Sequence, residues 1–471
     1  MKTIINIQLL QASIATLLTL TFLLHTLISG TPLTHLFLLD NLAISLSFAW
    51  CLLVSIIYYF CTRPRPVLLL DYTCFKPDFD RMLSLESCEY FVRRTRRINM
   101  ISEEFMRGIY RKSGVGEQTY GPNFLFQSYA DANLQSAVDE AEEGMFAAVG
   151  SLLDKTRIDP EQIDIVIVAC GSFALAPSLS SMIVNHFKLR PDVKTFNLSG
   201  MGCSSGVMSV DMAAKLLNCS RRIRYALIVV TENISLNWYF GNDRSMLVTN
   251  CIFRVGCAAA MITNDPSRRG EAKLELISSL RTHHGADDSA YAAAFQQEDE
   301  AGNPGVSLKK DLIRVAGLGL REHIRSLAPK VLPVSELISY AYSVVLSAVS
   351  GGESKPTVPD FTTAFDHFCI HTGGKAVIQQ VARVLRLGDD VTEPARMCLH
   401  RFGNTSSSLV FYELAYFEAK QRVKKGEKMW MLAYGTGFKV CSVVWKSLKD
   451  SRKDDGNPWN DCIHRYPLKN W

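Results

Sequence analysis

The sequence predicts an α/β protein in which helices cover both faces of a sheet. The 471 residues are 48% hydrophobic and 21% charged, enough for one large or two ordinary globular units with substantial cores. Short β-branched and apolar runs alternate with longer helical patterns, as in covered sheets. The order strand, small turn, helix occurs in both halves of the chain, which indicates two halves built on one plan.

The first sixty residues differ in kind from the rest. An uncharged run extends from Ile7 to Ile28, and a second apolar run from Leu42 to Phe60. Each run is long enough to favour a helix that crosses a bilayer of about 30 Å, so two transmembrane helices are predicted. A cleaved signal peptide followed by one anchor is the alternative. Lys2 precedes the pair and Arg63 and Arg65 follow it, which predicts both ends on the cytosolic side.

Strands and helices then follow in order. A helix is predicted at 130–156, and the acidic, Gly- and Pro-containing stretch 284–311 is expected to be a surface excursion between the halves. In the second half, 365–385 has the pattern of strand, glycine turn and helix, and 429–445 that of a hairpin. Strands are predicted at 67–72, 163–170, 193–200, 225–234 and 257–263.

These patterns give a provisional division of the chain. A membrane anchor is expected at 1–65 and a C-terminal tail at 451–471. Between them, 66–312 is expected to form the first α/β half and 313–450 the second.

Charge and cysteine content exclude several classes. A net charge of +5 over this length is too weak to indicate nucleic acid binding, and no such motif is present. The basic run Arg93–Arg97 is typical of a solvated helix face. The 13 cysteines have irregular spacing and no CxxC pair, so neither a disulfide framework nor a zinc knuckle is indicated.

The stretch NLSGMGCSSG surrounds Cys203 with small residues ahead of a predicted helix. Gly200 and Gly202 allow a tight turn, and Ser204 and Ser205 are candidate helix caps. A thiol at a helix start lies near the positive end of the helix dipole, which favours the thiolate. The unpaired N–H groups there are suited to an oxyanion. Cys203 is therefore either a nucleophile or a small structural thiol.

Two histidines lie close together in FDHFCIHTGG. On a strand, His367, Cys369 and His371 alternate onto one face, a spacing that also fits a metal if further ligands exist. His371 is the better catalytic candidate because Thr372 and two glycines follow it, which places it at a strand end facing a helix start.

His400 and Asn404 occur in HRFGNTSSS, where Asn404 is expected at a third strand-to-helix turn. An asparagine there is commonly only a helix cap. Cys203, His371 and Asn404 on three such turns would converge at the carboxyl ends of the strands, where α/β folds build their sites. Papain-like proteases use the same order of residue types, but the segment typical of their cysteine is absent.

The motifs GMGCSSG, TENISLNWYFGNDRSMLVTNCIFRVGCAAA, RTHHGADDSAY, FDHFCIHTGGKAVI, HRFGNTSSS, YELAYFEAK and YGTGFK closely resemble the plant 3-ketoacyl-CoA synthases. The resemblance runs from the apolar segments to about Leu448. It implies a thiolase-like fold of two similar α/β halves in αβαβα layers, a homodimer, and a multi-pass endoplasmic reticulum protein with its catalytic part on the cytosolic face.

The resemblance also assigns the site. Cys203 matches the acyl-accepting cysteine of the family, and His371 and Asn404 match the other members of its catalytic triad. Ser205, Thr372 and Cys257 depart from residues common in the family. The further histidines that the family counts as important match His283, His367 and His400.

The implied activity is that of an acyltransferase that joins a long-chain acyl-CoA to malonyl-CoA with loss of carbon dioxide, giving a 3-oxoacyl-CoA two carbons longer. No cofactor or metal is required, because the loss of carbon dioxide drives the step. The implied partners are the ketoacyl reductase, dehydratase and enoyl reductase of fatty acid elongation. A polyketide-type synthase of the same fold and a non-catalytic membrane scaffold that regulates active synthases are the alternatives.

Overall fold

The computed structural model describes residues 46–56, 65–127, 132–219, 222–350, 357–469 and 471. The chain divides into two compact units, Met1–Arg65 and Pro66–Trp471. In the first unit, residues 46–56 form a helix that exposes Phe48 and Trp50. The predicted span Ile7–Ile28 and both ends of the second predicted span lie outside the described residues. Among the helices that are described, none has the length and hydropathy needed to cross a bilayer.

The second unit is built on a mixed sheet of nine strands within the described ranges. Their order is β11-β12-β13-β8-β1-β7-β6-β4-β5. The N-terminal part of the sheet holds β1 (Leu68–Cys74), β4 (Ile163–Cys170), β5 (Lys194–Leu198), β6 (Tyr225–Thr231) and β7 (Cys257–Thr263). The C-terminal part holds β8 (Leu274–His283), β11 (His367–Ile370), β12 (Lys428–Gly435) and β13 (Lys439–Ser447).

Most of the predicted elements are confirmed. β4 and β7 have the predicted bounds, and β1, β5 and β6 lie within or overlap their predicted runs. The predicted hairpin is β12 paired antiparallel with β13. Most of these strands are apolar because both of their faces are covered, so their sequence signal is strong. The exception is the edge strand β5, which has exposed polar residues.

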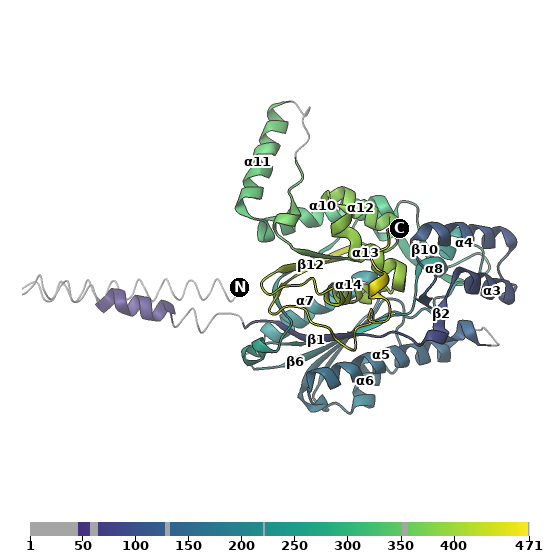
Figure 1. Cartoon of the computed structure of the whole chain (residues 1–471), viewed down its shortest axis with the longest axis horizontal. Helices are drawn as coiled ribbons and strands as arrows, with labels where there is room; N and C mark the ends of the chain where they lie inside the picture. Colours follow the sequence, from purple (N-terminus) through teal and green to yellow (C-terminus); the bar gives the residue numbers. More distant parts are fainter. Residues whose placement is uncertain (1–45, 57–64, 128–131, 220–221, 351–356, 470) are drawn as a thin grey trace, which may run out of the picture. The chain divides into compact units, whose positions relative to one another are not determined.

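Helices lie in three layers around the two parts of the sheet (Figure 1). The two halves therefore have the αβαβα arrangement that the family resemblance implies. The outer layer on the first half consists of α5 (Leu134–Thr156) and α6 (Leu179–Phe187). The outer layer on the second half consists of α10 (Leu312–Val331) and α12 (Lys375–Leu385). The middle layer consists of α7 (Ser205–Asn218) and α14 (Leu409–Ala419).

Smaller elements complete the described part of the second unit. These are α3 (Leu85–Thr95), α4 (Met100–Ser113), α8 (Arg244–Ile252), α9 (Asp288–Tyr291), α11 (Val334–Val349), α13 (Asp389–Phe402), the strand pair β2 (Met82–Leu83) with β3 (Thr119–Tyr120), the pair β9 (Ala294–Glu298) with β10 (Pro304–Leu308), and short 3-10 helices.

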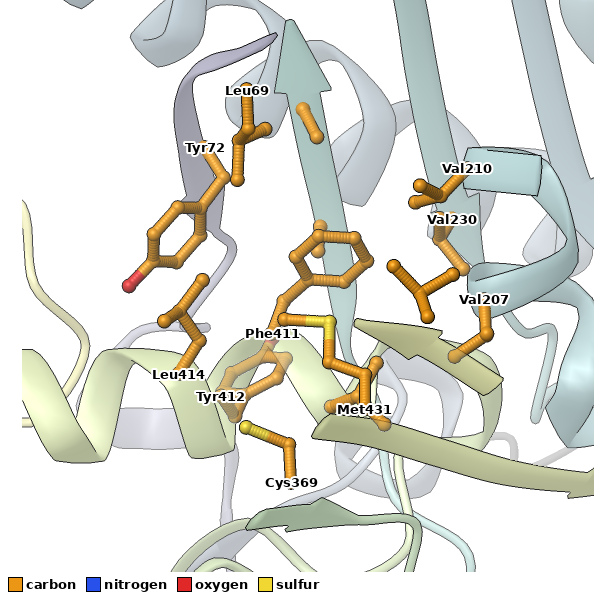
Figure 2. Packing of buried hydrophobic residues seen from close by; sticks show 14 of the residues in the cluster. Leu69, Tyr72, Val207, Val210, Val230, Cys369, Phe411, Tyr412, Leu414 and Met431 are labelled. Atoms are coloured by element: carbon orange, nitrogen blue, oxygen red, sulfur yellow. The ribbon is translucent and has the colours of Figure 1, made fainter. Parts of the chain in front are cut away.

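The middle layer forms the central core. α7 packs against strands of both parts of the sheet, and α14 packs against β1, β11 and β12. Val207 and Val210 of α7 and Phe411 and Leu414 of α14 are each at most 1% exposed. They belong to one apolar cluster that also contains Met431 of β12 (Figure 2). Full burial of each such side chain contributes about 1.5–3 kcal/mol, so this layer holds the two halves together.

Strand pairing differs from the expected division after residue 312. β8 precedes that boundary but pairs along its whole length with β13 of the C-terminal half. The stretch 284–311 is also more ordered than an excursion, because it contains α9 and the antiparallel hairpin of β9 and β10. Its Gly and Pro content marks the turns of a structured hairpin.

The starts of α7 and α14 meet without any side chain between them. Gly206 lies in the first turn of α7, and a Cβ there would overlap the carbonyl oxygen of Ser407 at the start of α14. Gly435 at the end of β12 makes a similar approach to the backbone of Met201. Neither Gly206 nor Gly435 has a positive φ, so backbone conformation does not require glycine at these positions. Glycine is required because the two backbones approach too closely for a Cβ atom.

Substituting Gly206→Ala should therefore separate the two helix starts. We expect a loss of about 2 kcal/mol in the free energy of unfolding, the usual size for overpacking, measured by urea denaturation. Gly150→Ala is the matched control, since Gly150 lies in α5 with open space around its Cα and should gain up to about 1 kcal/mol. Equal stabilities of the two variants would contradict the close contact.

Candidate active site

A cavity of about 350 Å³ brings three of the predicted residues together. Cys203, His371 and Asn404 all line it. They come from the start of α7, the end of β11 and the segment between α13 and α14, which are far apart in the sequence. The carboxyl ends of β11 and β12 and the middle-layer helix starts meet here.

Cys203 lies in a 3-10 turn, Gly202–Ser204, that leads directly into α7. Burial, with a smaller contribution from the charge of Glu232, raises the pKa of its thiol to about 12. The expectation that the helix start favours the thiolate is therefore wrong for the free protein. A helix dipole contributes at most about 2 kcal/mol and is outweighed by desolvation. Ser204 is also no side-chain cap, because its Oγ donates to the carbonyl oxygen of Met201 at 2.9 Å.

His371 is held by the backbone on both sides of it. Its N–H donates to the carbonyl oxygen of Leu432 at 2.8 Å, and the N–H of Ile370 donates to Glu413 of α14 at 2.7 Å. Burial lowers the pKa of His371 to about 3, so the imidazole is neutral at physiological pH. A neutral imidazole has one N–H to donate and cannot act as a permanent cation.

Asn404 follows helix α13 rather than a strand, which corrects the predicted strand-to-helix turn. Gly403, with φ of 69°, ends α13 and turns the chain. Asn404 then makes an isolated parallel bridge with Phe253, with its N–H donating to Ile252 at 2.9 Å. Its side-chain Oδ1 accepts the N–H of Ser406 at 2.9 Å, which leaves the Nδ2 amide as the group free to donate into the cavity.

A carboxyl group that lines the cavity near Cys203 was not predicted from the sequence. Glu232, just beyond β6, accepts the N–H and the Oγ–H of Ser172 at 3.0 and 2.7 Å and the Oγ–H of Ser406 at 2.8 Å. Ser406 Oγ lies 3.4 Å from the Sγ of Cys203. An acidic residue at the end of an apolar strand, in the run TENI, was the available signal.

The other three predicted histidines do not line this cavity. His283 is exposed at the end of β8, and its Nδ1 accepts the N–H of Gly285 at 3.0 Å. His367 lies 2.8 Å from Glu427, and His400 lies 3.0 Å from the hydroxyl of Tyr466. Each of the three therefore has a local hydrogen bond outside the cavity wall.

The rest of the cavity wall is largely apolar. Phe253 and Phe438 line it from the body of the unit, and Tyr291, Phe295 and Val306 line it from the α9–β10 segment. A hydrogen bond of 2.6 Å from Tyr239 to Asp299 ties the turn of the β9–β10 hairpin to the body. The site thus joins a polar end, at Cys203, to an apolar chamber.

Metal ligation finds no support in the part of the chain that the structure describes, where no group of three or more His, Cys, Asp or Glu side chains is placed to hold an ion. Cys369, one of the three residues considered for a metal, points into the central core and contacts the sulfur of Met429 at 3.6 Å.

Comparison with known proteins identifies the family. Residues 59–349 match the family described as "FAE1/Type III polyketide synthase-like protein", and residues 362–447 match "3-Oxoacyl-[acyl-carrier-protein (ACP)] synthase III C terminal". 3-Ketoacyl-CoA synthase 17 of Arabidopsis thaliana is 45% identical over 421 residues, 88% of this chain and 86% of that protein. The chain belongs to the 3-ketoacyl-CoA synthase family. It is therefore a condensing acyltransferase of very-long-chain fatty acid elongation.

Further relatives and solved structures agree with this family and fold. 3-Ketoacyl-CoA synthase 11 of Arabidopsis thaliana is 46% identical over 415 residues, 87% of this chain and 81% of that protein. A fungal type III polyketide synthase, ORAS, has a TM-score of 0.63 at 16% identity and covers 81% of this chain and 99% of its own. CsyB complexed with CoA-SH has a TM-score of 0.64 at 17% identity, with coverages of 81% and 100%. The thiolase-like fold is thus shared with polyketide synthases, whereas close identity is shared with ketoacyl-CoA synthases.

The raised pKa of Cys203 predicts slow alkylation that accelerates with pH. Below its pKa, the thiolate fraction of a thiol rises about tenfold per pH unit. We expect the rate of iodoacetamide labelling of the Cys203 peptide, followed by mass spectrometry, to rise in this way from pH 7 to 10 without a plateau. The exposed Cys219 in the same sample controls for reagent quality. A plateau near pH 7 would show that the helix start dominates after all.

Ser205 is one departure from the family pattern whose hydroxyl has no partner among the described residues. An unsatisfied buried hydroxyl costs about 1–3 kcal/mol, so Ser205→Ala should raise the free energy of unfolding by about 1 kcal/mol. Ser209→Ala is the matched control on the same helix. Its Oγ donates to the carbonyl oxygen of Ser205 at 2.7 Å, so its loss should destabilise. Thermal denaturation should show a higher melting temperature for Ser205→Ala and a lower one for Ser209→Ala. A lower melting temperature for Ser205→Ala would contradict the unsatisfied hydroxyl.

Proposed function

We propose that Cys203, His371 and Asn404 form the catalytic triad of a decarboxylative condensation between a long-chain acyl-CoA and malonyl-CoA. The observation that carries the proposal is their convergence on one cavity with a polar end and an apolar chamber. The apolar chamber fits an acyl chain, and the polar end fits the two thioesters that react.

In the first step, Cys203 attacks the acyl-CoA thioester. A bond forms between Sγ and the acyl carbon, the bond from that carbon to the CoA sulfur breaks, and the proton of Cys203 ends on the released CoA thiol. With its pKa near 12, Cys203 gives up this proton during the attack rather than beforehand. The protein thereby keeps a poorly reactive thiol until a thioester is bound.

In the second step, malonyl-CoA loses carbon dioxide. Nε2–H of His371 and Nδ2–H of Asn404 donate to the thioester carbonyl oxygen, which carries the negative charge of the enolate that forms. Each such donor contributes about 3 kcal/mol in a site that excludes water. The enolate carbon then bonds to the acyl carbon and the bond to Sγ breaks. The Cys203 thiolate takes up one proton, which comes from the solvent and balances the negative charge lost when the malonyl carboxylate leaves as carbon dioxide. The product is a 3-oxoacyl-CoA two carbons longer.

Two features of the chain support these roles. The low pKa of His371 keeps it neutral, so it binds the enolate without first attracting the malonyl carboxylate as an ion pair. The hydrogen bond from Ser406 fixes the amide of Asn404 with its donor toward the cavity. His367 and His400 are proposed to act indirectly through their bonds to Glu427 and Tyr466, and His283 through the turn that it supports.

We also propose attachment to the endoplasmic reticulum membrane through residues 1–65, with the catalytic unit on the cytosolic face. The two apolar runs and the exposed apolar side chains of helix 46–56 support attachment. A homodimer is supported by β5, an edge strand of the described sheet with exposed residues, two residues before Gly200. The proposed partners are the reductases and the dehydratase that act on the product.

The triad is tested in microsomes supplied with labelled malonyl-CoA and an acyl-CoA. Cys203→Ala should abolish the 3-oxoacyl product, because no acyl-enzyme forms. His371→Ala and Asn404→Asp should each lower condensation by about 10²-fold or more, because each removes an enolate donor, while acyl transfer to Cys203, seen by mass spectrometry, continues. His400→Asn, outside the cavity, should retain much of the activity. Product formation by Cys203→Ala would overturn the proposal.

Expression of the full chain in yeast distinguishes the alternatives. An active synthase adds new very-long-chain fatty acids to the lipid profile, and a polyketide-type synthase adds pyrones or other polyketides instead. A regulatory scaffold adds no product of its own.

A further inference from the structure

Helix α11 has its apolar side facing outward. Val334, Ile338, Tyr342, Val345 and Val349 follow at intervals of three or four residues and so share one face of the helix. They are between 58 and 80% exposed, and α11 has no buried residue. Figure 1 shows α11 standing away from the layered body.

The opposite side of α11 carries Glu336 and a line of serines, and this polar side contacts the chain itself. Glu336 accepts the N–H of Asp360 at 3.1 Å, and Ser343 Oγ accepts the N–H of Thr357 at 3.1 Å. A soluble helix turns its polar side to water and its apolar side to the core. The polar side of α11 instead contacts the returning segment 357–360. Its apolar side is open except at Leu337, which packs against the core.

The open face is too wide for a single partner helix. At 100° per residue, the apolar positions of α11 cover roughly 200° of its circumference, about twice the stripe that one packed helix requires. Its 16 residues give a length of about 24 Å, shorter than a hydrocarbon core of about 30 Å. These dimensions fit a helix embedded in one leaflet of a bilayer.

The helix that leads into α11 supports a lipid surface as the occupant. Arg321 and Arg325 lie exposed on the same face of α10 as Leu318, which is 50% exposed, and Lys330 is exposed at the end of the helix. Glu322, on the same face, pairs with His284 at 3.1 Å. Basic and apolar side chains on one helix face are typical of binding to anionic lipid headgroups. Between them, α10 and α11 therefore offer charge to the headgroups and apolar surface to the acyl region.

We propose that α11 inserts into the bilayer leaflet that faces the catalytic unit, as a membrane contact separate from residues 1–65. The first turns of α10 contribute Leu312 and Ala316 to the cavity wall. Because α10 runs from the cavity wall to α11, insertion of α11 would place the lipid no farther from the cavity than the length of α10. A long acyl chain, which gains about 0.8 kcal/mol per methylene in lipid, then enters the cavity from the membrane rather than from water. The substrate named here rests on the proposed function, whereas the insertion of α11 can be tested by a lipid contact that needs no enzymatic activity.

The test uses the full chain reconstituted in vesicles of phosphatidylcholine and phosphatidylserine, with benzoylphenylalanine in place of Val345. Photolysis should give an adduct with the mass of a phospholipid. Ser347, on the serine side of the same helix, is the matched control position and should give at least fivefold less lipid adduct. A dimer or an adduct with residues 1–65 as the main product of the Val345 position would overturn the inference.

A second variant separates this inference from the proposed function. Val345→Asp should lower condensation of a long-chain acyl-CoA presented in vesicles by at least fivefold, with activity on a short, water-soluble acyl-CoA unchanged. Ser347→Asp, which adds the same charge on the serine side, should leave both activities near normal. Equal loss with both substrates would mean that α11 serves folding alone. Absence of vesicle flotation by the unsubstituted chain would contradict membrane attachment itself, and absence of all condensation would contradict the proposed function.

Discussion

The contact between the starts of α7 and α14 is the constraint on which the rest of the structure depends. Because Gly206 has no side chain, the backbone of α7 reaches the carbonyl of Ser407, and the two central helices begin at one point. Cys203 lies just before one start and Asn404 just before the other. Any side chain at Gly206 would move Cys203 away from the amide of Asn404, so the packing of the two helices also fixes the spacing of the proposed catalytic residues.

Burial around this point sets the protonation states of the site. It raises the pKa of Cys203 and lowers that of His371, so both groups are neutral before substrate arrives. In many cysteine enzymes a thiolate is paired with a protonated histidine. Here the dry environment opposes such a pair and keeps the imidazole neutral, as the proposed role of His371 as a donor to the enolate requires. Glu232 and Ser406, which line the cavity together with Cys203, are joined to each other by a hydrogen bond of 2.8 Å at its polar end.

The β9–β10 hairpin, α10 and α11 all present apolar surface that suits the acyl chain of the proposed substrate. The β9–β10 hairpin closes the apolar chamber on one side, and α10 forms another wall and continues to α11. The chamber and the exposed face of α11 are both apolar, and one helix connects them. A substrate with a long acyl chain and a polar thioester needs this combination, since its chain avoids water at every stage.

The sequence by itself determined the α/β class, most strands, the family and the three residues that line the cavity. Apolar strands covered on both faces leave a strong local pattern, and small residues around Cys203, His371 and Asn404 mark tight turns at those positions. Tertiary structure decided what depends on neighbours far away in the chain. The pKa of Cys203 follows from desolvation, which a local helix-dipole argument does not contain. Asn404 follows helix α13, and its bridge to Phe253 joins it to a distant segment. The contacts of Glu232 and Gly206 likewise join distant segments. The run TENI marks an acidic residue at a strand end but does not specify its bond to Ser406, and the sequence around Gly206 does not specify its approach to Ser407.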